Sequence, residues 1–117
     1  INGWNDYFRE VLKVSWDVAD KSIPETAIPT PTDTIVFGEK RTGSTHFYMD
    51  AFEGNGNETE EVERSRHSGG KLMTKTGASN YTFADGSARM IKAGRLLAPL
   101  NLWMVTDRWR TNRVLSN

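Results

Sequence analysis

The chain has 117 residues, with 15 lysines and arginines, 15 aspartates and glutamates, 2 histidines and no cysteine. This length is typical of one domain, and we expect residues 1–117 to form a single globular unit. The absence of cysteine excludes disulfides, thiolate zinc sites, iron–sulfur clusters and a cysteine nucleophile. Zero net charge argues against a general nucleic-acid binder, and no apolar run approaches the roughly 20 residues of a membrane-spanning helix.

The net charge conceals an uneven distribution along the chain. Residues 1–63 carry 13 acidic and 5 basic residues, whereas residues 64–117 carry 2 acidic and 10 basic residues. The two parts therefore have net charges of −8 and +8. We favour the interpretation that these two halves pack against each other. The alternative is opposite charge on opposite faces, which would promote head-to-tail stacking of identical subunits.

A short amphipathic helix is predicted at residues 4–14. Asn5 is suited to cap it, because an asparagine side chain accepts hydrogen bonds from the free N–H groups of the first turn. The spacing places four apolar side chains on one helical face: Trp4, Phe8, Val11 and Leu12. Three prolines then predict an extended surface connection over residues 22–32.

Short runs of β-branched and aromatic residues indicate strands further along the chain. Residues 34–38 are typical of a buried strand, and residues 45–49 are predicted to pair with it through a turn at 41–44. Residues 53–63 are rich in glycine, asparagine and glutamate, which predicts a flexible acidic loop. The tail at 99–109 is predicted to be a short helix or an irregular segment laid across the sheet.

The strongest local pattern predicts a β-hairpin at residues 80–91. Asp85 and Gly86 stand between two alternating runs, which is typical of a two-residue type I′ turn with positive φ at both central residues. With this turn, one face of the hairpin carries two apolar pairs: Phe83 with Ala88, and Tyr81 with Met90. The opposite face carries Thr82 and Arg89.

These elements together predict an α+β fold. We expect an antiparallel sheet of about four strands, with the 80–91 hairpin at its centre, and short helices packed around it.

Several stretches resemble a large bacterial family, the prepilin-type, processing-associated proteins named for a histidine, nine residues and then Asp-Gly. The similarity rests on Arg66-His67-Ser68-Gly69-Gly70 and on the Phe-Ala-Asp-Gly run of the hairpin. The residues that match the motif are His67, Gly69, Gly70, Phe83, Asp85 and Gly86. Here seventeen residues separate the histidine from the aspartate, and we expect the extra ones in a longer loop within 71–79.

Three further stretches are similar to the same family. Residues 1–4, Ile-Asn-Gly-Trp, resemble its Asn-Gly-Trp element. Residues 31–39 resemble its element in which a strand is followed by Gly and an acidic residue, and the tail at 101–109 is also similar. The resemblance implies a pilin-like globular head, with the family's leader, cleavage site and N-terminal hydrophobic helix absent from these residues.

The resemblance also implies a function, a location and partners. Such a protein is a non-enzymatic structural subunit of a type IV pilus or of a type II secretion pseudopilus. The missing helix would anchor it in the bacterial inner membrane, and the head would lie in the periplasm or at the cell surface. Its partners would be copies of itself or other pilin-like subunits, with membrane contact through the helix only and no nucleic acid.

Glu39, His67 and Asp85 are the candidate metal ligands. Carboxylate oxygens suit calcium, which some related pseudopilins hold in their heads, whereas a histidine ligand points to a transition metal. We favour a structural role, in which the Asp85 carboxylate accepts N–H bonds within its turn or a hydrogen bond from His67.

The alternative function is that of a calcium- or carbohydrate-binding surface module. Four tryptophans could form a stacking platform for sugars, although we favour packing in the core: Trp4, Trp16, Trp103 and Trp109. An enzyme is not expected, since no serine lies in a Gly-x-Ser-x-Gly motif. Three arginines near the tail are interpreted as a solvated face or as partners of the acidic loop: Arg108, Arg110 and Arg113.

Overall fold

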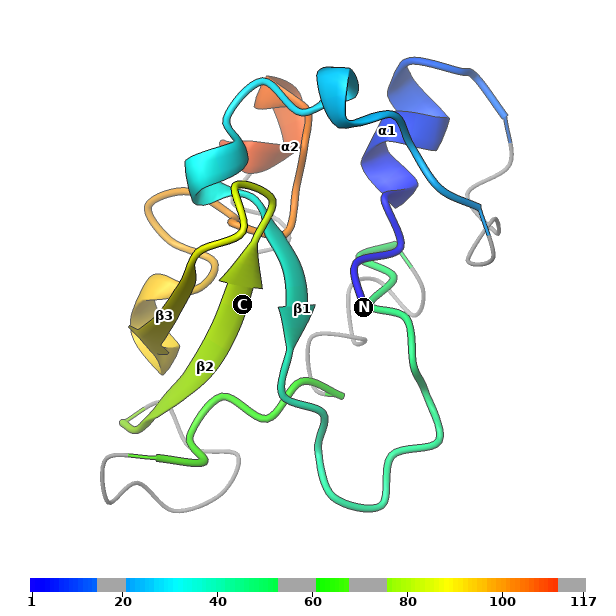
Figure 1. Ribbon diagram of the computed structural model, residues 1–117. Helices are drawn as coiled ribbons and strands as arrows, with labels where there is room; N and C mark the ends of the chain where they lie inside the picture. The colour runs from blue at the N-terminus through cyan, green and yellow to red at the C-terminus, as the bar shows by residue number, and fades with distance from the viewer. Residues whose placement is uncertain (15–20, 53–60, 68–75, 112–117) are drawn as a thin grey trace.

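Three short strands form an antiparallel sheet in the order β1-β2-β3. The computed structural model describes residues 1–14, 21–52, 61–67 and 76–111 (Figure 1). The strands are β1 Ile35–Gly38, β2 Ala78–Phe83 and β3 Ala88–Lys92. The helices are α1 Asn5–Glu10 and α2 Asp107–Arg110, with single 3₁₀ turns at Glu25–Ala27, Pro31–Asp33 and Ala93–Arg95.

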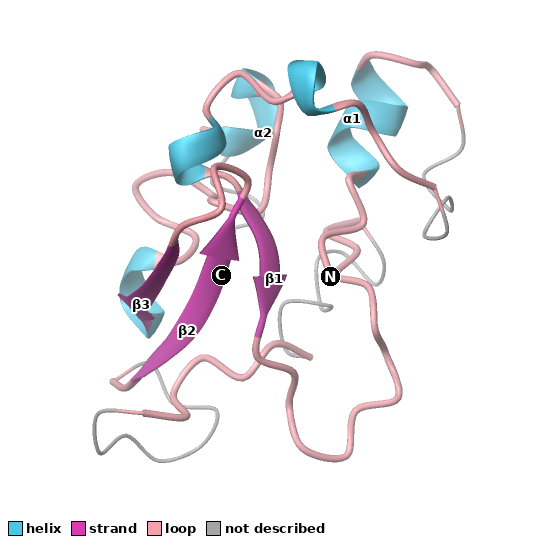
Figure 2. Cartoon of the chain, in the orientation of Figure 1, coloured by secondary structure: helices cyan, strands magenta, loops and turns pink. Residues whose placement is uncertain are grey.

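Loops connect most of these elements, and both α-helices lie beyond the same end of the sheet (Figure 2). The α+β class is therefore confirmed, but the described residues form three strands instead of about four. The hairpin is not wholly central either, because β2 is the middle strand and β3 lies at an edge. Within the described parts of the chain, no helix is both long and apolar enough to cross a membrane.

Helix α1 is shorter than the predicted helix at 4–14. It ends at Glu10, and the chain takes a left-handed conformation at Lys13, where φ is 56°. The side chains of Val11 and Leu12 are consequently about half exposed, at 53% and 49%, instead of facing the core. Asn5 does not cap the helix; the cap position is Trp4, whose φ is also 56°.

Strand β1 was predicted correctly, but its predicted partner at 45–49 was wrong. It pairs instead with β2, with Ile35 opposite Phe83 and Gly38 opposite Tyr81. The other edge of β1 is occupied, because the Ile35 N–H donates to Leu102 O and the Val36 carbonyl accepts from the Asn2 N–H. Residues 45–48 lie outside any strand and have exposed side chains.

The hairpin forms, but its loop has three residues instead of two. The Phe83 N–H donates to Ser87 O at 2.9 Å, and the Gly86 N–H donates to Phe83 O at 2.9 Å. Gly86 has a φ of 86°, whereas Asp85 does not have positive φ. A three-residue loop that ends in a left-handed glycine is a common alternative to the type I′ turn.

The extra loop residue shifts the hairpin register by one, so the predicted faces were wrong. Tyr81 lies opposite Arg89, and Asn80 lies opposite Met90. Arg89 therefore lies on the inner face, where its guanidinium carbon is 3.7 Å from the centre of the Phe83 ring. Met90 lies on the outer face and is 57% exposed.

The main core is built on the inner face of β1 and β2. The Tyr81 and Trp103 rings meet edge to face, with centroids 6.2 Å apart. Before α2 begins, the tail crosses the sheet as an irregular segment. This is one of the two forms that the sequence predicted for it. The buried members of this core are Ile35, Met49, Ala51, Val62, Tyr81, Phe83, Leu96, Leu97, Trp103, Met104 and Trp109.

A smaller cluster joins α1 to the tail and to the connection at 22–32. Trp4, Phe8 and Val105 are its buried members, with Ile23 and Ile28 packed against them. The connection makes two 3₁₀ turns in place of the predicted extended run, which allows its isoleucines to turn toward this cluster.

The acidic first part of the chain (residues 1–63) and the basic second part (64–117) pack against each other, which is the interpretation that we favoured. Every ion pair found between described residues joins an acid of the first half to a base of the second. These pairs are Glu39 with Arg66 and with His67, Asp33 with Arg89, and Glu10 with Arg108. Most of the predicted acidic loop, at 53–60, lies outside the described residues, as do Trp16, Gly69, Gly70 and Arg113.

A first prediction concerns Gly38, whose backbone lies close to two aromatic rings of the core. A Cβ added at Gly38 would lie 2.9 Å from the Tyr81 ring and 3.0 Å from the Trp103 ring. We expect Gly38→Ala to lower the free energy of unfolding by about 1–3 kcal/mol, because it overpacks the core. At Gly94 an added Cβ meets nothing within 4 Å, so Gly94→Ala is the matched control. Equal effects in urea unfolding would contradict this packing.

Candidate functional site at the hairpin tip and the Glu39–His67 pair

Glu39 and His67 are brought together at the Ala78 end of β2, which is the lower end of this strand in Figure 1. Glu39 follows β1 directly, and its Oε1 lies 3.0 Å from His67 Nε2. Its Oε2 accepts the Asn80 N–H at 2.7 Å, and Arg66 Nε lies 3.5 Å from Oε1. His67 is positioned by a backbone bridge, in which it exchanges both hydrogen bonds with Ala78. The first residue of β2 therefore fixes the histidine beside the carboxylate.

Asp85 lies at the tip of the hairpin, beyond the other end of β2. Its Oδ1 accepts the Ser87 hydroxyl at 2.7 Å and the Ser87 N–H at 2.9 Å. These bonds, the hydroxyl first, hold the pKa of the Asp85 carboxyl below its usual value. The structural role that we favoured for Asp85 is confirmed, since its carboxylate closes its own turn.

The structure does not bring Glu39, His67 and Asp85 to one site. Five residue steps along β2 separate the Ala78 end from the Phe83 end, which corresponds to about 17 Å. No group of three or more histidine, aspartate or glutamate side chains able to hold a metal occurs in the described parts of the chain. The candidate three-ligand site is therefore not formed, and Asp85 and His67 are too far apart for the alternative hydrogen bond between them.

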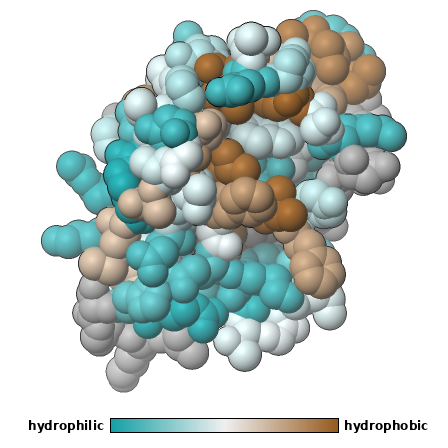
Figure 3. All heavy atoms as spheres, in the orientation of Figure 1, coloured by the Kyte–Doolittle hydropathy of each residue, from teal (hydrophilic) through white to brown (hydrophobic). Residues whose placement is uncertain are grey.

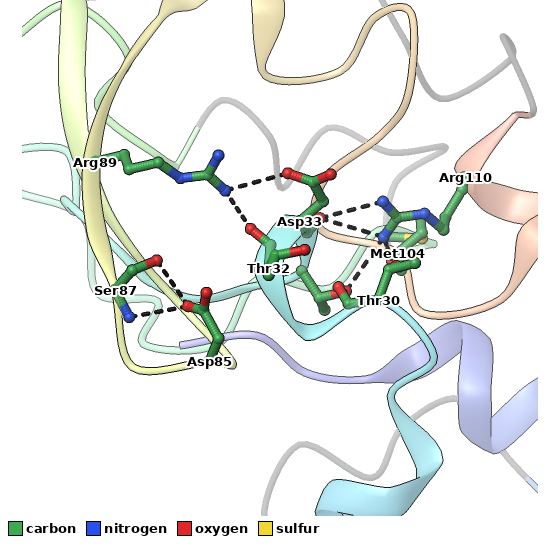
Figure 4. Close-up of polar contacts among 9 residues, drawn as sticks. Thr30, Thr32, Asp33, Asp85, Ser87, Arg89, Met104 and Arg110 are labelled. Atoms are coloured by element: carbon green, nitrogen blue, oxygen red, sulfur yellow. Dashed lines mark hydrogen bonds and ion pairs between the residues drawn. The ribbon is translucent and has the colours of Figure 1, made fainter.

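The hairpin tip is docked on the segment that precedes β1. The Ala84 N–H donates to Thr34 O at 2.9 Å, and the Asp85 N–H donates to Pro31 O at 3.2 Å. Arg89 donates to the carbonyl of Thr32 and to the Asp33 carboxylate (Figure 4). The Phe-Ala-Asp-Gly motif therefore connects two distant parts of the chain.

Arg110 approaches the same segment from the other side, as Figure 4 shows. Its guanidinium is buried, and it donates to Asp33 O at 3.2 Å, to Thr34 Oγ1 at 3.2 Å and to Met104 O at 2.9 Å. Burial lowers the pKa of Arg110. The prediction of a solvated face was wrong for this arginine. It applies to Arg108, which is 68% exposed and pairs with Glu10 at 3.1 Å.

Asp6 is a buried carboxylate that no sequence motif singles out. Its side chain is fully buried in α1, and its Oδ2 accepts three hydrogen bonds from the tail. The donors are the Val105 N–H at 2.8 Å, the Thr106 N–H at 2.7 Å and the Thr106 hydroxyl at 2.9 Å. Burial raises the pKa of Asp6, and these hydrogen bonds oppose the shift. A carboxyl so enclosed holds the tail against α1.

The three tryptophans among the described residues do not form a stacking platform. Trp4, Trp103 and Trp109 are at most 9% exposed, which confirms that they pack in the core. The Trp109 N–H donates to Glu10 at 3.1 Å, so this ring also joins α2 to α1. That hydrogen bond, followed by the charge of Arg108, holds the pKa of the Glu10 carboxyl below its usual value.

A small hollow of about 30 Å³ opens beside Glu39, and its walls are mainly apolar. Ile1, Phe47 and Tyr48 flank it, and the buried Trp103 ring forms part of its base. Figure 3 shows further apolar side chains at the surface where α1 ends, and Val11, Leu12 and Val14 are the exposed residues there. These surfaces are suited to contact with another apolar surface.

Comparison with known proteins adds no relative. No protein-family model matches the chain, and no curated protein or solved structure is significantly similar to it. The resemblance described above therefore depends only on the motif residues themselves.

A second prediction compares two neighbouring arginines. Arg110→Met removes a buried donor and leaves Asp33 O and Met104 O without it, so we expect the free energy of unfolding to fall by about 2–3 kcal/mol. Arg108→Met is the matched control and should change it little, because an exposed ion pair contributes little. Urea unfolding measures both, and a larger loss at Arg108 would contradict the buried role of Arg110.

A third prediction concerns the pH dependence of stability. Asp6→Ala leaves the buried Val105 N–H and two partly buried donors of Thr106 without this acceptor, and should lower the free energy of unfolding by about 3 kcal/mol. Asp6→Asn keeps an oxygen acceptor and should cost less. Asp6→Asn also removes the ionisable carboxyl, so the comparison with wild type isolates the effect of its protonation on stability.

The folded-state pKa of Asp6 is raised, so the proton binds the folded state more tightly than the unfolded state. The stability that this proton adds is complete below the unfolded pKa, near 3.8, and is lost as the pH rises through the folded pKa. The stability of wild type relative to Asp6→Asn should therefore decrease from about pH 4 upward. A difference that stays constant in urea unfolding over this range would contradict the raised pKa.

Proposed function

We propose that the chain is the globular head of a pilin-like or pseudopilin-like subunit, a structural protein that assembles into a filament. The observation that carries the proposal is the role of the residues behind the family resemblance. Asn2, Gly3, Gly38, Phe83 and Asp85 all hold the framework together, through buried packing or hydrogen bonds to backbone. A motif of this kind serves a subunit whose task is to keep its shape.

The geometry at Ile1 is compatible with a helix that precedes it. Ile1 is 45% exposed, and its nitrogen donates to Phe47 O at 2.8 Å. A peptide N–H at the same place can make the same bond, so a longer chain would not disturb this contact. In the proposed subunit, that helix anchors the protein in the inner membrane and then forms the filament core.

The head then lies on the periplasmic or outer side and contacts copies of itself or other pilin-like subunits. The apolar residues at its surface support such contacts, since the side chains of Phe47 and Tyr48, which line the hollow, are exposed to solvent. The charge asymmetry does not by itself support stacking, because the ion pairs described above use part of it within one chain.

Processing of the full-length precursor tests this proposal. The gene is expressed with an active prepilin peptidase and with an inactivated one, and the intact mass and N-terminal residue of the product are determined. We expect the active peptidase to remove a short leader ahead of an apolar helix whose first residue is methylated. The inactivated peptidase should leave the leader in place.

An ordinary secretory signal, or a product that is identical with both peptidases, would contradict the proposal. The similarity of the hairpin to the family motif would then be only a shared local structure.

A further inference from the structure

Asn2 and Gly3 form a dipeptide with its own chemistry. The backbone nitrogen that follows an asparagine can attack the side-chain amide, and glycine hinders this attack least because it has no Cβ. The chain has two such dipeptides, Asn2–Gly3 and Asn55–Gly56. Only the first lies among the described residues.

In the folded chain, the atoms that would react at Asn2 are all engaged. Its Nδ2 donates to Ile35 O at 2.7 Å and to Trp103 O at 2.8 Å. Its Oδ1 accepts the Trp4 N–H at 2.9 Å, and the nucleophile, the Gly3 nitrogen, donates to Met49 O at 3.1 Å. Asn2 is only 2% exposed, so water has no access to the amide carbon.

We propose that Asn2 is a deamidation site that reacts only when the chain unfolds, and that the reaction prevents the return to the native fold. In the unfolded chain, the Gly3 nitrogen loses its proton to a base in solution and attacks Cγ of Asn2. The new N–Cγ bond closes a five-membered imide; the Cγ–Nδ2 bond breaks, and the departing nitrogen takes a proton from the protonated base and leaves as ammonia. Water then adds to either imide carbonyl and opens the ring, which leaves aspartate or isoaspartate at residue 2.

Either product is incompatible with the contacts of the native amide. A carboxylate has no N–H to donate to Ile35 O and Trp103 O, and its charge would face both carbonyl oxygens inside the core. Isoaspartate also adds a carbon to the backbone, which displaces Gly3 from Met49 O. The modification is therefore a lasting record that a molecule has been unfolded. This inference does not depend on the proposed function.

Peptide mass spectrometry tests the first part of the inference. The whole chain is incubated at mildly alkaline pH in buffer and in concentrated urea, and the conversion of asparagine to the acid is followed with time in the peptides that contain Asn2 and Asn55. In urea we expect both Asn–Gly peptides to react, with Asn55 as the reference for the chemistry. In buffer the Asn2 peptide should react at least about 100-fold more slowly than in urea, since few molecules are unfolded. Equal rates at Asn2 in buffer and in urea would overturn the claim that Asn2 reacts only in the unfolded chain.

Refolding of the partly reacted sample tests the second part. Urea is removed, and native molecules are separated from the rest by size-exclusion chromatography. We expect the native fraction to retain intact Asn2, and the non-native fraction to be enriched in aspartate and isoaspartate at residue 2. The same modified proportion in both fractions would overturn the claim that the reaction prevents refolding.

Discussion

The side-chain amide of Asn2 holds together three segments that are far apart in the sequence. It donates to Ile35 in β1 and to Trp103 in the tail, and it accepts from Trp4 at the start of α1. Because the sheet has three short strands, these segments cannot be held by strand pairing alone. The amide adds a side-chain hydrogen bond at Ile35 O to the backbone bonds that Leu102 and Asn2 make with β1, where a further strand would otherwise pair.

Asp6 and Arg110 make the same kind of contact at two other places, between a buried side chain and the backbone of an irregular segment. Asp6 receives the backbone of the tail, and Arg110 donates to the carbonyl of Asp33 at the segment before β1. Each is a buried polar side chain that satisfies backbone groups of an irregular segment. Such contacts are costly to leave incomplete, so they allow a chain with little regular structure to adopt one arrangement.

Local patterns predicted the elements better than their partners. The hairpin was predicted because Asp-Gly and the alternating strands lie within one stretch, but its register depended on one extra loop residue at the turn. The pairing of β1 with β2 was missed because it joins residues more than forty positions apart. Asp6 and Arg110 were missed as framework residues for the same reason, since their partners are identified only once the chain has folded.

We expect the Asn2 amide to belong to the part of the structure that is lost only on global unfolding. Hydrogen exchange of its two Nδ2 protons, measured by NMR on ¹⁵N-labelled protein in the native state, tests this directly. Their protection should correspond to the full free energy of unfolding and should fall with urea at the same slope as global unfolding. Fast exchange that is independent of urea, while β2 amides remain protected, would contradict it.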